Sequence, residues 1–143
     1  MALAVVDANV VAKWFLEEEY TEPARQLRED FLEGSLRLQV PSLLPFEVLN
    51  ALKYNPSFPV RALPAASRAL DAAGLLTVPL FGEYAERAAV LSSRFDLTIY
   101  DAAYVALADL VDCTLYTSDR ELVALSATRA PIVHIRDYRR DLG

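Results

Sequence analysis

The sequence predicts an α/β fold in which a central parallel β-sheet of four to five strands is flanked by helices on both faces. Short apolar, β-branched runs alternate with longer segments of helical pattern, which is typical of strands joined by helical crossovers. The first run, residues 3–9, is almost continuously apolar until it reaches Asp7, as expected of a strand buried on both faces. Gly34 and Gly74 each follow a helical segment, where glycine commonly ends a helix.

The expected elements follow one another in regular order along the chain. We expect strands at residues 3–9, 36–40, 75–78, 113–117 and 132–135. We expect helices at residues 10–16, 23–33, 43–54, 60–73, 83–94, 100–111 and 120–126. Pro23 is expected at the first position of its helix, where a missing N–H is tolerated, and residues 136–141 form a polar end.

Length and composition indicate one domain spanning residues 1–143 with ample apolar material for a core, since 54% of the residues are hydrophobic. The net charge of −6 argues against a broad basic face for nucleic acid, but not against metal ions that contact phosphate. The single Cys113 lies in an apolar run and is expected to be a buried thiol, which fits a reducing cytoplasm. We find no leader peptide and no apolar stretch long enough for a membrane span.

Four acidic residues occupy equivalent places, either just past a strand or in the first turn of a helix: Asp7, Glu47, Asp101 and Asp119. The carboxyl ends of parallel strands meet at one edge of a sheet, and ligands bind there. Converging carboxylates repel one another and raise each other's pKa values, and a divalent cation removes that repulsion. Mg²⁺ and Mn²⁺ prefer oxygen ligands. The pattern therefore predicts metal-assisted hydrolysis of a phosphodiester.

The segment around Glu47 adds a second polar side chain. Residues 43–54 are otherwise mostly apolar, and Asn50 lies three residues after Glu47 on the same helical face. A buried helix with one acid and one amide on a common face indicates a site, and we expect Asn50 to support Glu47.

Each acid also has a purely structural alternative. Asp7 is placed to cap the helix that follows it, and Glu47 fits the preference of helix N-termini for acids. Asp119 is likewise placed to cap the next helix. Two capping boxes are also possible, pairing Thr98 with Asp101 and Ser118 with Glu121.

Other catalytic arrangements find little support. The only histidine, His134, lies in the last expected strand, so no Ser-His-Asp or Cys-His set is available, and we expect a structural role for it. With only four glycines, the chain has no glycine-rich phosphate loop.

Four stretches resemble, in the same order, the four motifs of PIN-domain ribonucleases, and most of all the VapC toxins of prokaryotic toxin–antitoxin pairs. They are VVDAN at 5–9, PSLLPFEVLNAL at 41–52, LTIYDAAYVALA at 97–108 and YTSDREL at 116–122. Together they span nearly the whole chain. Each motif is weak alone, and their combination and order make the resemblance specific.

The resemblance implies a PIN fold and a Mg²⁺- or Mn²⁺-dependent endoribonuclease. Asp7, Glu47, Asp101 and Asp119 match the acidic catalytic and metal-site positions, and Asn9 and Thr117 match supporting polar positions. It also implies a homodimer and a VapB-like antitoxin whose C-terminal segment blocks the site. For such a pocket, guanidinium is the natural partner of carboxylates, so we expect that segment to carry arginine.

For the mechanism we expect Asp7, Asp101 and Asp119 to hold one ion, while Glu47 orients a water or completes a second site. Two cations, Lys13 and Arg120, lie near site residues in the sequence and either contact RNA phosphates or are solvated surface charges. Tyr100 and Tyr104 either stack on a base or pack in the core.

Two other functions remain compatible with the residues. In the first, Asp7 is the covalent nucleophile of a phosphohydrolase similar to haloacid dehalogenases, although this chain has Asp7-Ala8-Asn9 where that family has two aspartates. In the second, the acids form a non-catalytic pocket for an arginine-bearing partner. A trapped phosphoaspartate would indicate the first, and partner binding without RNA cleavage would indicate the second.

Overall fold

The computed structural model describes residues 2–125 and 128–139, and it contains a five-stranded, fully parallel sheet in the order β3-β2-β1-β4-β5. The strands are β1 (Ala2–Val6), β2 (Leu36–Pro41), β3 (Leu76–Val78), β4 (Thr114–Thr117) and β5 (Ile132–His134). This arrangement confirms the predicted fold class, a parallel sheet of four to five strands. The order of the strands across the sheet was not predicted from the sequence.

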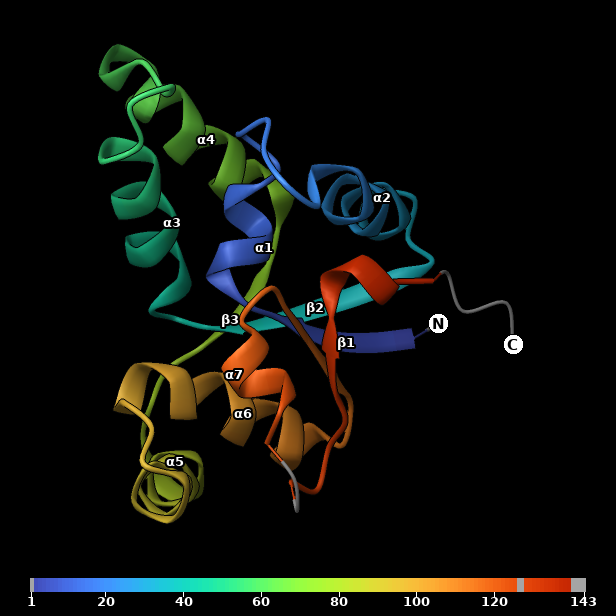
Figure 1. Ribbon diagram of the computed structural model, residues 1–143, viewed down its shortest axis with the longest axis vertical. Coiled ribbons are helices and arrows are strands. Elements are labelled where there is room, and N and C mark those ends of the chain that lie inside the picture. The colour runs from blue at the N-terminus through green and yellow to red at the C-terminus, as the bar shows by residue number, and fades with distance from the viewer. Residues whose placement is uncertain (1, 126–127, 140–143) are drawn as a thin grey trace.

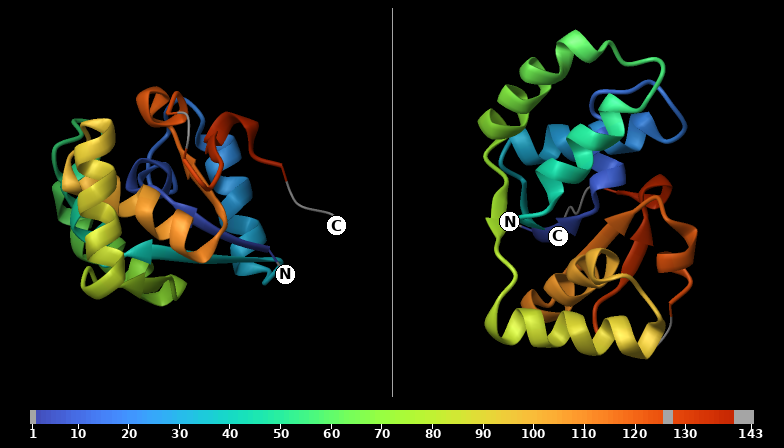
Figure 2. Two further views of the ribbon diagram at one scale, coloured as in Figure 1. Left: turned by 90° about the horizontal axis from the view of Figure 1, so that it is seen from below. Right: turned by 90° about the vertical axis from the view of Figure 1, so that its left-hand side faces the viewer.

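Helices cover both faces of the sheet (Figures 1 and 2). They are α1 (Ala8–Ala12), α2 (Thr21–Leu32), α3 (Leu44–Lys53), α4 (Leu63–Ala73), α5 (Gly82–Phe95), α6 (Ile99–Val111) and α7 (Arg120–Val123), with 3₁₀ turns η1 (Val60–Ala62) and η2 (Ile135–Asp137). Helices α1 to α4 lie on one side of the sheet, and α5 and α6 lie on the other. None of the described helices is long and apolar enough to cross a membrane.

The central position of β1 explains the apolar run at the start of the chain. β1 pairs with β2 on one side and with β4 on the other, and Val5 and Val6 have no exposed surface. A parallel strand covered on both faces requires apolar residues at successive positions. The chain after β1 turns to β2, whereas β4 adds on the opposite side of β1. The gap between the ends of β1 and β4 is therefore a topological switch point, where α/β proteins bind ligands.

Helix α6 is the most deeply buried helix near this edge. Eight consecutive residues, 102–109, are buried, because α6 packs between the sheet and α5. The hydroxyl of Tyr84 on α5 donates a hydrogen bond to the carbonyl oxygen of Ala103 at 2.7 Å. The apolar character of this segment in the sequence thus reflects contact on all sides.

Several element boundaries differ from those expected. Helix α2 begins at Thr21, so Pro23 is its third residue rather than its first. The backbone N–H groups of the first helical turn have no carbonyl acceptor within the helix, so a proline, which lacks an N–H, is tolerated at this position as well. The predicted helix at 60–73 is divided into η1 and α4, with Pro64 in the first turn of α4. Helix α7 ends at Val123. Residue 126 of the predicted last helix and residues 140–141 of the predicted polar end lie outside the described residues.

Cys113 immediately precedes β4 and is buried, as the sequence predicted. Burial raises the pKa of its thiol to about 11. The thiol is therefore protonated and unreactive at neutral pH, because the thiolate is the nucleophilic form.

Candidate active site

The four predicted acids line one cavity at the carboxyl edge of the sheet. Its volume is about 230 Å³, and its walls also include Ala8, Asn9 and Ala51. The acids come from four separate segments: Asp7 follows β1, Glu47 and Asp101 lie in the first turns of α3 and α6, and Asp119 follows β4. The structure thus brings these four side chains together from positions up to 112 residues apart (119 − 7).

Asp7 occupies the N-cap position of α1, but its side chain makes no capping hydrogen bond. Its Oδ2 instead accepts a hydrogen bond from Thr117 Oγ1 at 2.8 Å and one from Asn9 Nδ2 at 3.2 Å. The capping alternative for Asp7 is therefore wrong. The carboxylate is held across the ends of β1 and β4, which is the switch point of the sheet.

Thr117 joins the two halves of this edge. Its hydroxyl, which is fully buried, donates to Asp7 and accepts from the Asp119 backbone N–H at 3.0 Å. Asn9 Nδ2 also lies 3.3 Å from the Thr117 hydroxyl, and Asn9 Oδ1 accepts from the Ser118 backbone N–H at 3.1 Å. One hydroxyl proton and two lone pairs are all used, so this network fixes Asp7 relative to the turn that carries Asp119.

The carboxylates interact electrostatically. The pKa of Asp7 is raised to about 7, mainly by burial and also by the charges of Glu47 and Asp101, while the hydrogen bond from Thr117 opposes this rise. Burial, followed by the charge of Asp101, also raises the pKa of Glu47, and burial with the charge of Asp119 raises that of Asp101. A bound cation would favour the ionised form of all these groups.

Two of the predicted helix caps form in the structure: Asp119 caps α7, and Thr98 caps α6. Asp119 caps α7, because its Oδ1 accepts from the backbone N–H groups of Glu121 at 2.9 Å and Leu122 at 3.4 Å. Asp119 rather than Ser118 is the N-cap, so the predicted Ser118–Glu121 capping box is wrong. In α6, the Thr98 hydroxyl accepts from the Asp101 backbone N–H at 3.1 Å. That cap uses the backbone of Asp101, while its carboxylate lines the cavity.

Tyr104 packs in the core, one of its two predicted alternatives, and it also contacts a candidate site acid in a way that the sequence reasoning missed. Its hydroxyl donates to Glu47 Oε1 at 2.7 Å, and its ring has no exposed surface. Base stacking by Tyr104 is therefore excluded, whereas Tyr100 is 60% exposed. The available sequence signal was the spacing of three residues between Asp101 and Tyr104, which places both on one helical face.

Three other residues that the sequence associated with the site, Asn50, Lys13 and Arg120, do not line the cavity. Asn50 is exposed and is not part of the cavity wall; Ala51, four residues after Glu47, takes that place. Lys13 is buried and forms an ion pair with Glu18 at 3.0 Å, so its charge is neutralised rather than solvated. Arg120 is exposed at the start of α7.

His134 is buried at the end of β5, and its Nδ1 accepts a hydrogen bond from the Arg136 backbone N–H at 3.1 Å. Burial and nearby cations lower the pKa of this imidazole. The side chain caps η2, which agrees with the structural role predicted from the sequence.

The donor set fits a hard divalent cation. It consists of carboxylate oxygens with one buried acid of raised pKa, and such acids are stabilised in the ionised form by a nearby positive charge. Among the described residues, no three acidic, histidine or cysteine side chains are placed to coordinate one ion together. Mg²⁺ commonly keeps several waters and takes only one or two carboxylates directly, so these residues fit an ion held partly through water.

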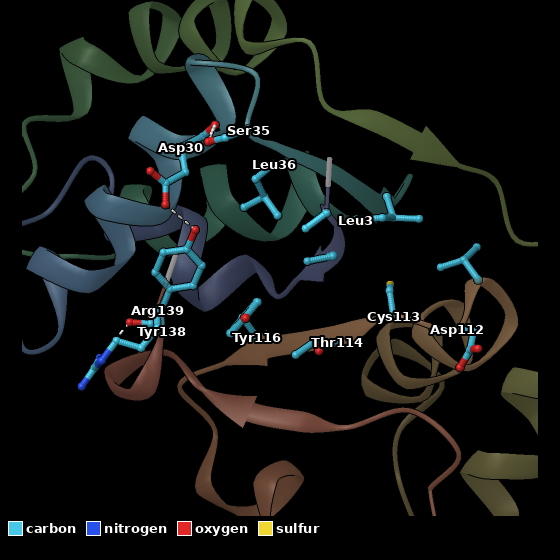
Figure 3. Close-up of a pocket in the computed structure, with 13 residues that line it drawn as sticks. Leu3, Asp30, Ser35, Leu36, Asp112, Cys113, Thr114, Tyr116, Tyr138 and Arg139 are labelled. Atoms are coloured by element: carbon cyan, nitrogen blue, oxygen red, sulfur yellow. Dashed lines mark hydrogen bonds between the residues drawn. The ribbon is translucent and has the colours of Figure 1, made fainter. Parts of the chain in front are cut away.

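A second cavity, of about 290 Å³, lies at the opposite, amino-terminal edge of the sheet (Figure 3). Its buried Asp30 already accepts hydrogen bonds from the Tyr138 hydroxyl at 2.6 Å and from Gln26 Nε2 at 3.1 Å. Figure 3 shows the Tyr138 hydroxyl directed at Asp30. The hydrogen bond between Tyr138 and Asp30 joins the segment after β5 to α2, which is a structural role. The four converging acids line the cavity at the opposite edge of the sheet.

Comparisons with known proteins agree with this geometry. Residues 4–127 match the PIN domain family, and this range contains all four acids. The chain is 32% identical to ribonuclease VapC3 of Pyrobaculum aerophilum over 122 residues, which cover 82% of this chain and 90% of that protein. It is 32% identical to ribonuclease VapC9 of Mycobacterium tuberculosis over 133 residues, or 91% and 96% of the two chains.

A solved structure supports the fold. A toxin–antitoxin complex from Klebsiella pneumoniae contains a chain that matches with a TM-score of 0.69 at 19% identity, covering 92% of this chain and 97% of that one. The match over residues 4–127 and the VapC relatives lead to one assignment. The chain belongs to the PIN-domain family, and its relatives over most of its length are VapC ribonucleases.

Proposed function

We propose that this protein is a VapC-like toxin, a Mg²⁺- or Mn²⁺-dependent endoribonuclease that hydrolyses RNA at the cavity of four carboxylates. The convergence of Asp7, Glu47, Asp101 and Asp119 on one cavity carries this proposal. The relatives that match most of the chain are named ribonucleases, which supports the choice of RNA as the substrate.

The residues of the chain divide the work as follows. Asp7, Asp101 and Asp119 hold the ion, directly or through water. When bound, the ion neutralises phosphate charge and lowers the pKa of a water molecule. Thr117 and Asn9 hold the Asp7 carboxylate in position through the hydrogen bonds to its Oδ2. Glu47 orients the attacking water in line with the scissile bond.

RNA contacts are local, since the net charge of the chain is −6 and no broad basic face is implied. Arg120 is exposed next to Asp119 and is suited to contact a phosphate beside the scissile one. Lys13 is bound to Glu18, so it contributes less to RNA binding than Arg120.

The alternative of Asp7 as a covalent nucleophile is less consistent with its surroundings. The side chain is 6% exposed, and its Oδ2 accepts two hydrogen bonds. A nucleophilic oxygen must instead approach the phosphorus of the substrate in line.

The acidic cavity also suits a partner that carries arginine. We propose a co-encoded VapB-like antitoxin whose C-terminal segment inserts a guanidinium among the carboxylates, because arginine pairs carboxylates through two parallel hydrogen bonds. The matched Klebsiella pneumoniae structure is a toxin–antitoxin complex, which supports a partner of this kind. We further propose a homodimer that acts in the cytoplasm.

The test is cleavage of a mixed RNA substrate by purified protein with Mg²⁺ or Mn²⁺ and with EDTA. Wild-type protein should cleave only with metal, and Asp7→Asn should abolish cleavage. Asp71→Asn is the matched control, because it makes the same charge change at an exposed residue of α4. Equal cleavage by Asp7→Asn would point to a contaminating nuclease and remove the proposal. Metal-loaded protein without cleavage but with tight partner binding would instead indicate the non-catalytic pocket.

A further inference from the structure

Tyr104 brings a phenol hydroxyl to one of the carboxylates that line the acidic cavity. Its ring is fully buried in α6, and the hydroxyl donates to Glu47 Oε1 at 2.7 Å. Burial, the hydrogen bond to Glu47 and the charges of Asp7 and Glu47 all raise the pKa of this phenol far above its usual value. In this pair the phenol hydroxyl is the donor and the Glu47 carboxylate oxygen is the acceptor.

The hydrogen bond restricts a side chain that otherwise has several rotamers. Glu47 is half-buried in the first turn of α3, and holding a glutamate in one rotamer costs conformational entropy. Tyr104 has one hydroxyl proton, which goes to Oε1. The other carboxylate oxygen, Oε2, receives no hydrogen bond from Tyr104, and it belongs to a side chain that lines the cavity.

We propose that Tyr104 is a positioning residue for Glu47: it holds Oε1, so that Glu47 offers the cavity a single oxygen, Oε2, for an ion or its water. This inference rests on the proposed metal-dependent function and extends it to a residue outside the four acids. It assigns Glu47 a one-oxygen role rather than a bidentate one.

Core packing alone does not require this hydroxyl. A phenylalanine would fill the same volume, and burying a hydroxyl is unfavourable unless it is hydrogen-bonded. Tyr84 provides the comparison within the same helix pair, because its hydroxyl donates to the backbone carbonyl of Ala103 at the same distance of 2.7 Å. The bond of Tyr84 joins α5 to α6, whereas the bond of Tyr104 ends on a site carboxylate.

The experiment is calorimetric titration of Mn²⁺ into the RNA-free protein. Tyr104→Phe should weaken Mn²⁺ binding by about 10–100-fold, the usual effect of removing a residue that orients a metal ligand. Tyr84→Phe is the matched control, because it removes an equivalent buried hydroxyl. It should lower the melting temperature yet leave Mn²⁺ affinity within about twofold of wild type. Mn²⁺ affinity of Tyr104→Phe within twofold of wild type would overturn the inference.

A double-mutant cycle shows whether the effect passes through Glu47. In a Glu47→Ala background, Tyr104→Phe should change Mn²⁺ affinity by less than about twofold, since no carboxylate remains to be positioned. A further tenfold loss in that background would place the effect of Tyr104 elsewhere and overturn the inference.

A measurement on the wild type makes the test independent of how the variants fold. Titration with Mg²⁺ should shift the NMR resonance of the Tyr104 Cζ carbon to saturation and leave that of Tyr84 unchanged. An unmoved Tyr104 resonance in Mg²⁺-saturated protein would reject the positioning role while leaving the proposed function intact. Wild-type protein that binds neither Mg²⁺ nor Mn²⁺ would overturn the metal-dependent function and this inference together.

Discussion

The single carboxylate of Asp7 makes the stability of the metal-free protein depend on pH. Its pKa in the folded protein, about 7, lies above the usual 3.8, so the native state binds more protons than the unfolded state between these values. The free energy of unfolding must therefore fall as pH rises from about 4 to about 7. Glu47 and Asp101 contribute in the same direction, because their pKa values are also raised.

We expect urea unfolding in EDTA to give a larger free energy of unfolding at pH 5 than at pH 7.5. Asp7→Asn should reduce this difference, because the amide does not titrate. The same slope in wild type and mutant would mean that Asp7 is not the perturbed group.

A substitution at Asp101 distinguishes its role as a metal-site residue from a role in capping α6. The Thr98 hydroxyl caps α6 through the backbone N–H of Asp101, and Asp101→Asn keeps that N–H. In EDTA the mutant should melt at or above the wild-type temperature, because it loses carboxylate repulsion. It should also lose the rise in melting temperature that millimolar Mg²⁺ or Mn²⁺ gives the wild type, since ligand stabilisation follows affinity for the native state. A mutant that melts lower in EDTA and keeps the full rise would place Asp101 outside the site.

Among single residues, the sequence was most informative about the charged ones. An ionised side chain is unfavourable next to a buried apolar segment unless it caps a helix or binds a ligand. The convergence of Asp7, Glu47, Asp101 and Asp119 at one edge of the sheet was therefore predictable. Tyr104 was not, because a tyrosine in an apolar helix has the same pattern whether its hydroxyl binds a carboxylate or a carbonyl. The ion pair of Lys13 with Glu18 was equally hidden, because it depends on how the chain turns after α1.

At the scale of elements, Asp119 combines two roles at the start of α7. It caps the helix through Oδ1 and also lines the acidic cavity. Asp119→Asn should retain the cap, since asparagine caps about as well as aspartate, whereas Asp119→Ala should cost about 0.5–2 kcal/mol more in EDTA.

Both substitutions should abolish the metal-induced rise in melting temperature if Asp119 also belongs to the metal site. The check is a set of denaturant titrations and melting curves for the two variants with and without Mg²⁺. Equal stability of the two variants in EDTA would show that the cap contributes nothing.

The elements themselves were predictable where apolar periodicity was strong, as in β1 and α6. Their ends were less so. The start of α2 at Thr21 depends on the Thr21 hydroxyl, which donates to the Leu16 carbonyl oxygen and accepts from the Glu18 N–H. The short α1 likewise ends where the chain turns through Lys13 to Phe15. Such contacts are formed only once the surrounding chain is folded.

At the scale of the molecule, an overall negative charge and an acidic cavity favour a basic inhibitory segment. A synthetic peptide from the C-terminal segment of the co-encoded partner should inhibit RNA cleavage. Changing its arginines to alanine should remove inhibition, and changing them to lysine should weaken it, because lysine lacks the bidentate geometry. Inhibition that survives the alanine changes would rule out insertion of a guanidinium as the mechanism.

The position of β1 in the middle of the sheet has a consequence during protein synthesis. β1 is made first, but one of its two neighbours, β4, begins at Thr114. Until that strand leaves the ribosome, Asp7 has no Thr117 to hold it and Asp119 is missing from the cavity. An incomplete or truncated chain thus carries most of the acids but not their arrangement. The growing chain therefore cannot form the site before Asp119, which follows β4, has left the ribosome.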